Sequence, residues 1–258
     1  MVFGMRRLSI FLVARKAGDS PSSVLCCPDL SLILPSLNEA NSIGAVLDYL
    51  AAHCAGARIL VADDGSTDGT QDIVRRYADR HVVLLDRSGE IEHGLTASVL
   101  AAARRVETPF FVVMDADGQH PPEKVGEFVR LLRGGARVVV GSRIRVEEHW
   151  PWPRKMLSYA GTALGKTTLL ARGKQSLSYD LLSGFFGLST EFFRDITRGR
   201  EDARHIRGRG YKVLFDLLKL MPDGQEIEEV YYRFETRRGG RSKMTWTVGL
   251  EYLKAVMR

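Results

Sequence analysis

Two carboxylates and an amide stand close together near the middle of the chain, at Asp115, Asp117 and Gln119. The residues before them, 110–114, are apolar and rich in aromatic and β-branched side chains, and they are too few for a helix. They therefore predict a buried strand that ends at the acids. Ligands of open α/β sheets bind at the carboxyl ends of strands, and carboxylate and amide oxygens suit a phosphate-carrying Mg²⁺ or Mn²⁺. The alternative is that the acids only cap a helix predicted to begin at Lys124.

Polar side chains follow three further predicted strands. Because the carboxyl ends of parallel strands meet at one edge of a sheet, we expect these side chains to line a single crevice. The recurrence favours a site over a set of independent helix caps. The strands and the residues that follow them are 30–34 with Pro35, Leu37 and Glu39; 58–62 with Asp63 and Asp64; and 136–140 with Arg143.

Strands and helices alternate from residue 30 to residue 140, which predicts an α/β fold with a mostly parallel central sheet flanked by helices. A helix capped by Asn41 or Ser42 follows the first strand, because its apolar residues recur at helical spacing. The later third is less regular. Its predicted elements are a helix over 154–170, a short strand near 183–188, a helix over 211–220 and an alternating strand over 228–234.

The end of the chain combines a basic loop with an amphipathic helix. Glycines between Arg237 and Lys243 would let backbone amides approach a diphosphate while the cations neutralise it, although such loops are also common as solvated turns. Residues 245–258 have an apolar stripe with Lys254 and Arg258 outside it. This helix either packs on the domain or lies in a membrane interface.

Composition sets the outer limits. A chain of 258 residues with 45% hydrophobic content fits one large α/β domain or two small ones, and its net charge of +6 favours anionic partners. Three cysteines are too few for a disulfide framework, so we expect a reducing compartment. No apolar run approaches the ~20 residues of a membrane-spanning helix. Residues 1–29 are predicted to be an appendage, disordered or at a membrane surface.

Two nucleotide-binding patterns are not fulfilled. Residues 161–167 resemble a phosphate-binding P-loop, but they have one residue too few between the glycines and lack a preceding strand. No Gly-x-Gly-x-x-Gly opens a first βα unit, which weighs against a dinucleotide-dependent dehydrogenase.

Six motifs in order, from residue 30 to the end, resemble those of the dolichyl-phosphate mannose synthases, which are family-2 glycosyltransferases with the GT-A fold. The resemblance implies inverting transfer of mannose from GDP-mannose to dolichyl (polyprenyl) phosphate with Mg²⁺ or Mn²⁺. It also implies one GT-A domain over 30–258. The motifs are Pro35 to Glu39, Asp63 to Thr70, Asp115 to Glu123, Gly141-Ser142-Arg143, Ser183-Gly184-Phe185-Phe186, and Arg237 with Ser242-Lys243.

The resemblance implies roles for individual residues. Nucleotide-sugar contacts would come from Pro35, Leu37, Glu39, Asp63 or Asp64, Asp115, Ala116, Asp117, Arg143, Arg237 and Lys243; the metal from Asp117 and Gln119; and the lipid phosphate from Arg154 and Ser158, with Asp117, Arg143 and Arg154 as catalytic residues. Residues 144–148 and Gly118 depart from the family pattern, and 144–152 lie on the implied acceptor side.

The chemistry of the implied acceptor agrees with these residue types. A phosphate monoester has its second pKa near 6, so it is largely anionic at neutral pH and needs no general base. The protein must then neutralise two anions and align them. The helix over 245–258, or a membrane-spanning partner subunit, would bring the chain to the cytoplasmic face of a membrane as a peripheral protein.

Three other functions remain open at this point. The first is a related transferase that uses UDP-glucose or another nucleotide sugar. The second is a non-catalytic module that binds nucleotide sugars or lipid phosphates. A nucleic-acid binder is the third, but it would need a basic stripe with interleaved aromatics, whereas the basic residues here gather around the predicted crevice. We therefore expect no nucleic-acid partner.

Overall fold

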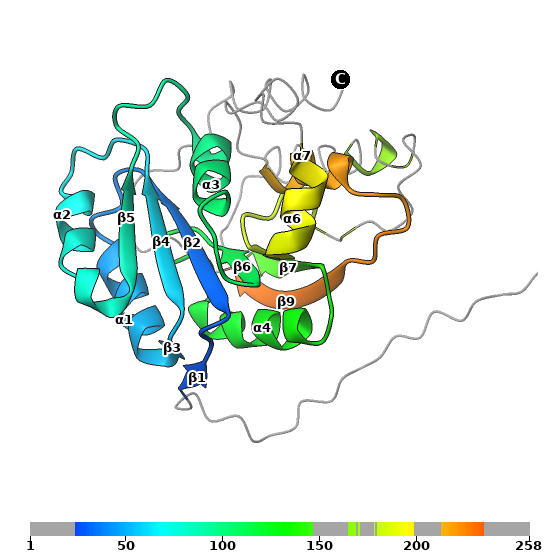
Figure 1. Ribbon diagram of the computed structural model, residues 1–258, viewed down its shortest axis with the longest axis horizontal. Helices are drawn as coiled ribbons and strands as arrows, with labels where there is room; N and C mark the ends of the chain where they lie inside the picture. The colour runs from blue at the N-terminus through cyan, green and yellow to red at the C-terminus, as the bar shows by residue number, and fades with distance from the viewer. Residues whose placement is uncertain are drawn as a thin grey trace, which may run out of the picture.

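The computed structural model describes residues 24–146, 165–168, 170, 178, 180–198 and 213–234. Seven of its strands form one sheet in the order β5-β4-β2-β6-β8-β7-β9 (Figure 1). These strands are β2 (Leu30–Ser36), β4 (Arg58–Asp63), β5 (Val82–Asp86), β6 (Phe110–Val113), β7 (Val138–Val146), β8 (Phe186–Ser189) and β9 (Glu228–Phe234).

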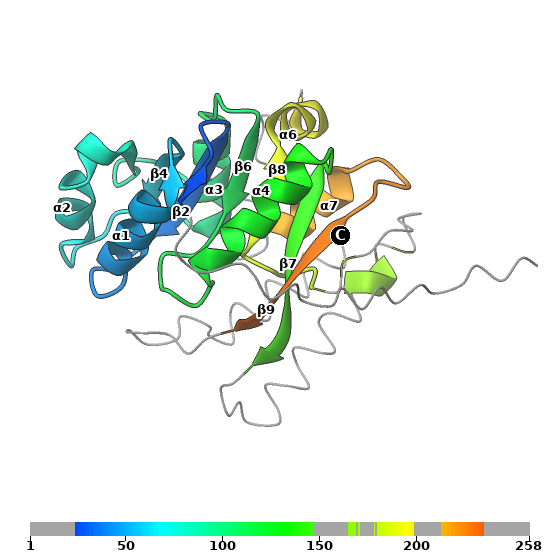
Figure 2. The same cartoon turned by 90° about the horizontal axis from the view of Figure 1, so that it is seen from below.

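The sheet is mostly parallel, as predicted. Strand β2 pairs in parallel with β4 and β6, and β4 with β5. Strand β8 is the exception, because it lies between β6 and β7 and runs antiparallel to both. Strands β7 and β9 form a long parallel ribbon that runs past the other strands (Figure 2).

Helices cover both faces of the sheet and give three layers (Figure 1). Every residue of β2 is buried, because each face of the sheet packs against a separate apolar cluster. Successive strand residues serve opposite clusters: Leu32 packs with one and Ile33 with the other. One cluster contains α1 (Ile43–His53), α2 (Thr70–Arg75) and α4 (Val125–Arg133); the other contains α3 (Leu95–Ala103), α6 (Thr190–Thr197) and α7 (Val213–Leu220).

The folded part of the chain begins before residue 30. Strand β1 (Leu25–Cys26) pairs in parallel with β3 (Cys54–Ala55), and Cys27 is fully buried. Arg133, at the end of α4, donates to both carboxylate oxygens of Asp29 at 2.7 and 2.8 Å and to the carbonyl of Cys26 at 2.8 Å. Residues 25–29, assigned above to the N-terminal appendage, are therefore attached to the domain.

Several predicted boundaries change once the neighbours of each element are known. The strand predicted over 136–140 continues to Val146 because β9 pairs with it that far, so Arg143 lies within β7 instead of after it. Ser42 is the N-cap residue of α1, but its hydroxyl donates to the carbonyl of Glu39 and makes no cap hydrogen bond.

Of the helix predicted over 154–170, the structure describes only residues 165–168 and 170, and these are helical. The basic loop and the helix over 245–258 lie outside the described residues. Within the part of the chain that is described, no helix combines the length and the apolar character needed to cross a bilayer.

Candidate active site

The structure brings most of the predicted site residues to one edge of the sheet. Ser36 pairs with Asp63 across β2 and β4, so the ends of these two strands are level. Ile33 pairs with Val113 across β2 and β6, and this register, continued by two residues, sets Asp115 level with Pro35. The carboxyl ends of β2, β4 and β6 therefore lie level at the edge of the sheet where ligands of open α/β sheets bind.

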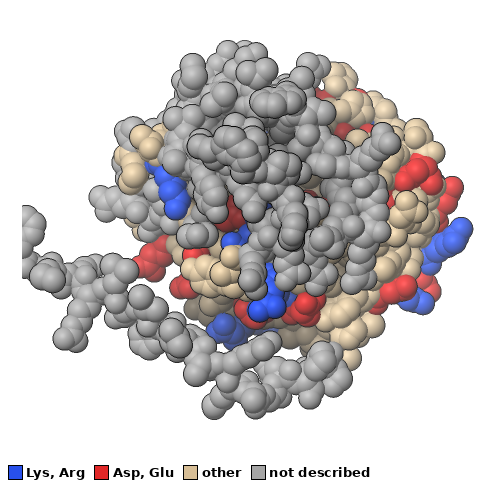
Figure 3. Space-filling model, turned by 180° about the vertical axis from the view of Figure 1, so that it is seen from behind, with Lys and Arg blue, Asp and Glu red and all other residues tan. Residues whose placement is uncertain are grey.

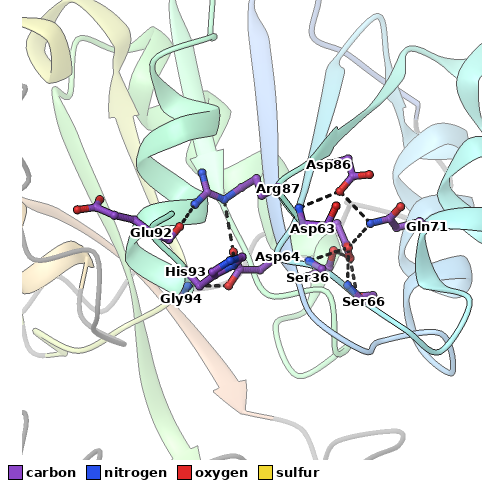
Figure 4. Close-up of polar contacts among 12 residues, drawn as sticks. Ser36, Asp63, Asp64, Ser66, Gln71, Asp86, Arg87, Glu92, His93 and Gly94 are labelled. Atoms are coloured by element: carbon purple, nitrogen blue, oxygen red, sulfur yellow. Dashed lines mark hydrogen bonds and ion pairs between the residues drawn. The ribbon is translucent and has the colours of Figure 1, made fainter. Parts of the chain in front are cut away.

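Asp63 is fully buried and is used by the protein itself (Figure 4). One carboxylate oxygen accepts from the amides of Gly65 and Ser66 at 3.3 and 2.8 Å and from the Gln71 side chain at 2.8 Å. The other accepts from the hydroxyls of Ser36 and Ser66 at 2.8 and 2.5 Å. These bonds hold the turn after β4, so the geometry favours a structural role for Asp63 and leaves Asp64 as the nearer candidate for a ligand contact.

Asp64 is held in place by the segment that leads into α3 (Figure 4). Its oxygens accept from the amide of Gly94 at 2.6 Å and contact the imidazole of His93 at 3.1 Å. The guanidinium of Arg87, which is almost fully buried, lies 3.5 Å from the same carboxylate and donates to the carbonyl of Glu92 at 2.5 Å. Neither His93 nor Arg87 was predicted from sequence, because neither belongs to a motif that marks this contact.

The loops after β2 and β4 are joined to each other. The amide of Asn38 donates to Ser66, and the side chain of Asn38 accepts from the amide of Thr67. Asn38 has a φ of 55°, a left-handed conformation that asparagine tolerates better than most residues. These contacts carry Leu37, which is 37% exposed, and Glu39, which is half-buried, on a fixed loop beside the turn.

The Asp115–Gln119 loop is closed by local hydrogen bonds. The amide of Gln119 donates to Asp117 at 3.0 Å, and Gly118 takes the left-handed φ of 77° that lets the chain turn between them. The amide of Asp115 donates to Nδ1 of His120 at 3.0 Å. Asp117 is buried, whereas the Asp115 side chain is 34% exposed. No cap hydrogen bond from a side chain is made at the following 3-10 helix, η2 (Pro122–Lys124), so the helix-cap alternative does not describe these acids.

An aromatic cluster lies beneath this loop. The buried ring of His120 stacks on Phe185 with centroids 5.2 Å apart and meets Tyr232 edge-on at 5.8 Å. Burial raises the pKa of the Tyr232 hydroxyl. Gly184 passes so close that a Cβ there would be 3.2 Å from both Asp115 oxygens and from Cε1 of His120. The Ser183-Gly184-Phe185 motif therefore serves to let the chain pass Asp115 and to support His120.

Arg143 forms a two-pronged ion pair with Asp180. Its Nε and Nη2 donate to the two carboxylate oxygens at 2.5 and 2.9 Å. Burial on its own would lower the pKa of Arg143, but the bonds to Asp180 outweigh it, and the pKa is raised above its ordinary value. Asp180 was not among the predicted site residues, since it lies 37 positions away and no local pattern links the two.

The donor set of the loop fits a hard divalent cation. Among the described residues, no three His, Cys, Asp or Glu side chains are grouped to hold a metal ion. Mg²⁺ is commonly held by one or two carboxylates together with substrate phosphates and water, so two acids and an amide on one tight loop meet its needs. The Asp115 side chain is the more exposed of the two acids, and the buried Asp117 is fixed by the amide of Gln119.

Charges of both signs are mixed on the face shown in Figure 3, where basic and acidic side chains of the described residues lie beside one another. A continuous basic stripe, which nucleic-acid binding requires, is not seen among the described residues of that face. Four predicted site residues fall outside the described part of the chain: Arg154, Ser158, Arg237 and Lys243.

Comparison with known proteins is consistent with this geometry. The family model of glycosyl transferase family 2 matches residues 31–197. A dolichol-phosphate mannosyltransferase from Mycosarcoma maydis is 29% identical, over 94% of this chain and 83% of its own length. A polyprenol monophosphomannose synthase from Mycolicibacterium smegmatis is 30% identical, over 89% of this chain and 86% of its own length.

The fold is also found in a solved structure. Glucosyl-3-phosphoglycerate synthase from Mycobacterium tuberculosis, crystallised with Mn²⁺, UDP-glucose and phosphoglyceric acid, superposes with a TM-score of 0.62 at 20% identity. The match covers 88% of this chain and 78% of that one, and it confirms the predicted GT-A fold. The sequence match over residues 31–197, with the relatives and the fold in agreement, shows that this chain belongs to glycosyl transferase family 2.

Proposed function

We propose that this glycosyltransferase moves mannose from GDP-mannose to a dolichyl or other polyprenyl phosphate, with inversion at the anomeric carbon. The observation that carries the proposal is the meeting of the Asp115–Gln119 loop and Arg143 on neighbouring parts of one sheet edge, in a chain whose relatives are named as mannosyltransferases of polyprenyl phosphates. Acids that suit a cation and a cation that suits phosphate are what a nucleoside diphosphate donor requires.

Asp117 and Gln119 would hold Mg²⁺ or Mn²⁺, with Asp115 beside them. The ion, when bound, neutralises charge on the leaving diphosphate. The protein's own part is to keep the loop closed through the amide of Gln119 and the ring of His120, which fixes where the acids lie before the donor arrives. Such preorganisation accounts for much of the rate in reactions that develop charge on a leaving group.

The nucleoside would lie against Pro35, Leu37 and Glu39. Asp64 would contact its guanine ring, and Ala116 would contact the nucleotide. Leu37 offers exposed apolar surface to a ring, and the fixed carboxylate of Asp64 is an acceptor suited to guanine N–H groups. We assign the alternative acid, Asp63, to the turn. Arg143 would face the diphosphate, and Arg237 and Lys243 would close over it.

Arg154 and Ser158 would bind the acceptor phosphate. Because that phosphate is already anionic, the chain has to position it and offset its charge, and no base is needed. Arg154→Ala should then weaken use of the lipid phosphate much more than GDP binding, and equal losses would move Arg154 to the donor side.

Access to the lipid would come from peripheral association with the cytoplasmic face of a membrane through 245–258, or from a membrane-spanning partner. Unchanged liposome flotation after deletion of 245–258 would rule that helix out as the anchor.

A transfer assay tests the function directly. GDP-mannose, UDP-glucose and UDP-N-acetylglucosamine, each radiolabelled, are offered with polyprenyl phosphate in detergent, with Mg²⁺ or with EDTA. We expect a lipid-soluble product from GDP-mannose that disappears with EDTA and falls to a trace in Asp117→Ala. Product from a uridine donor alone would contradict the donor assignment, and near-normal transfer by Asp117→Ala would contradict the metal site.

A further inference from the structure

The guanidinium of Arg143 is fixed by one carboxylate that the proposed function has not used. Asp180 accepts from Nε and Nη2, and the two side chains are only 24% and 10% exposed. A guanidinium is planar, with five N–H donors, and a two-pronged carboxylate takes two of them along one edge. The pair therefore sets both the plane and the direction of the Arg143 head group.

Asp180 is itself held by hydrogen bonds that lead through Ser178 to Glu229 in β9. Its amide donates to the hydroxyl of Ser178 at 3.2 Å, and that hydroxyl donates to Glu229 at 2.8 Å. The hydroxyl of Ser142 donates to the same oxygen of Glu229 at 2.8 Å, and Tyr231 donates to the other oxygen at 2.5 Å. Glu229 thus ties the Asp180 segment to β7 and β9, the two strands that carry Arg143 and its neighbours.

Burial gives this pair a different character from the surface pairs. Arg58 and Glu107 form a single 2.7 Å contact with 39% and 81% of their side chains exposed, where water and salt screen the interaction. The side chains of Arg143 and Asp180 are largely buried, so removal of the carboxylate would cost a buried cation its two-pronged partner. The Arg143–Asp180 pair has a net charge of zero, which limits its electrostatic attraction for a diphosphate. We therefore attribute its contribution to the orientation of the guanidinium.

We propose that Asp180 is a positioning residue for Arg143: it holds the guanidinium in the direction from which it meets the donor diphosphate, and Ser178 and Glu229 hold Asp180 in turn. This inference rests on the proposed function, because it takes Arg143 as a contact of the donor. In this proposal Asp180 acts on the donor only through Arg143.

The test is a double-mutant cycle of Asp180→Asn and Arg143→Gln, read in kcat and KM with the donor that the wild-type protein accepts. Each single variant should lower kcat/KM by about 10- to 100-fold, mostly through kcat, because orientation matters most as charge develops. The double variant should be no worse than Arg143→Gln alone, since a positioning residue has nothing left to position. Glu107→Gln, which breaks the exposed pair, is the matched control and should keep wild-type kcat/KM.

Folding is followed separately by the melting temperature of each variant. If Asp180→Asn does not fold, the double variant replaces the pair by two neutral amides, and its comparison with Arg143→Gln still decides the question. Losses that multiply in a folded double variant, or wild-type kcat/KM in Asp180→Asn, would overturn the positioning role. Product from a uridine donor would overturn the donor assignment but leave the cycle measurable with that donor, so the two failures are distinct.

Discussion

Gly184 offers the sharpest test of the site, because a single methyl group there reaches the predicted metal loop. The Cβ of Gly184→Ala would lie 3.2 Å from Oδ1 and Oδ2 of Asp115 and from Cε1 of His120. Favourable contacts of carbon begin at about 3.5 Å, so these atoms must move by a few tenths of an ångström. Asp115 is the one that can move, since its side chain is partly exposed while the ring of His120 is packed against Phe185.

The expected loss follows from that displacement. Misplacing a reacting group by about 1 Å costs roughly 100-fold in rate, so a shift of a few tenths of an ångström should lower kcat/KM by about 3- to 6-fold, or about 0.6–1 kcal/mol. Overpacking costs about 1–3 kcal/mol of stability, and the lower entropy of the unfolded alanine chain returns about 0.4–1 kcal/mol of it. The protein should therefore stay folded, with a melting temperature lower by at most roughly 10 °C.

Two assays separate the active site from the fold. Transfer kinetics give kcat/KM, and titration of Mn²⁺ in the presence of GDP, followed by electron paramagnetic resonance, reports on the loop without turnover. Gly126→Ala is the control. Gly126 lies in α4, where alanine is the better helix former, and its new Cβ would have Leu25, at 3.9 Å, as its near neighbour. Wild-type kcat/KM and Mn²⁺ affinity in folded Gly184→Ala would refute this reasoning, as would an equal loss in Gly126→Ala.

Two further predictions concern stability. Asp63→Asn should lower the free energy of unfolding, measured in urea titrations, by about 1–3 kcal/mol. The loss stays within this range because the Ser36 and Ser66 hydroxyls, which donate to the carboxylate, can turn to accept from the new amide. Lost GDP binding at unchanged stability would instead make Asp63 a ligand contact. The bonds from Arg133 hold the pKa of Asp29 below its ordinary 3.8, so the stability they add is complete above that pH and is lost as the pH falls through the lowered pKa. The melting-temperature gap between wild type and Asp29→Asn should shrink below about pH 4, and a gap that is the same at pH 6 and pH 3 would contradict this.

Much of the sheet could be predicted from sequence because its signals are local. A buried strand that ends in acids can be recognised from a dozen residues, and the carboxyl-edge rule then gathers Asp63, Asp64 and Asp115 without knowledge of their contacts. The six motifs identified the family for the same reason, since each is contiguous.

The parts that were missed depend on partners distant in the sequence. Two-residue strands such as β1 have no periodicity to detect, and no pattern in β8 tells that it lies between β6 and β7. Asp180 finds Arg143 only when the chain is folded. Adjacent acids also look alike in sequence, yet Asp63 is enclosed by five donor atoms and Asp64 by a different set, which only the packing reveals.

The late insertion of β8 has a consequence for synthesis of the protein. Strand β8 begins at Phe186, 40 positions after β7 ends at Val146, so at about 5–20 residues per second a ribosome needs about 2–8 s to supply it. Until then β6 and β7 lack the strand that joins them, and their unpaired edges are open to wrong partners. Asp115, which follows β6, and Arg143, in β7, cannot reach their final spacing before β8 is inserted. The active site is therefore completed only after most of the chain has been translated.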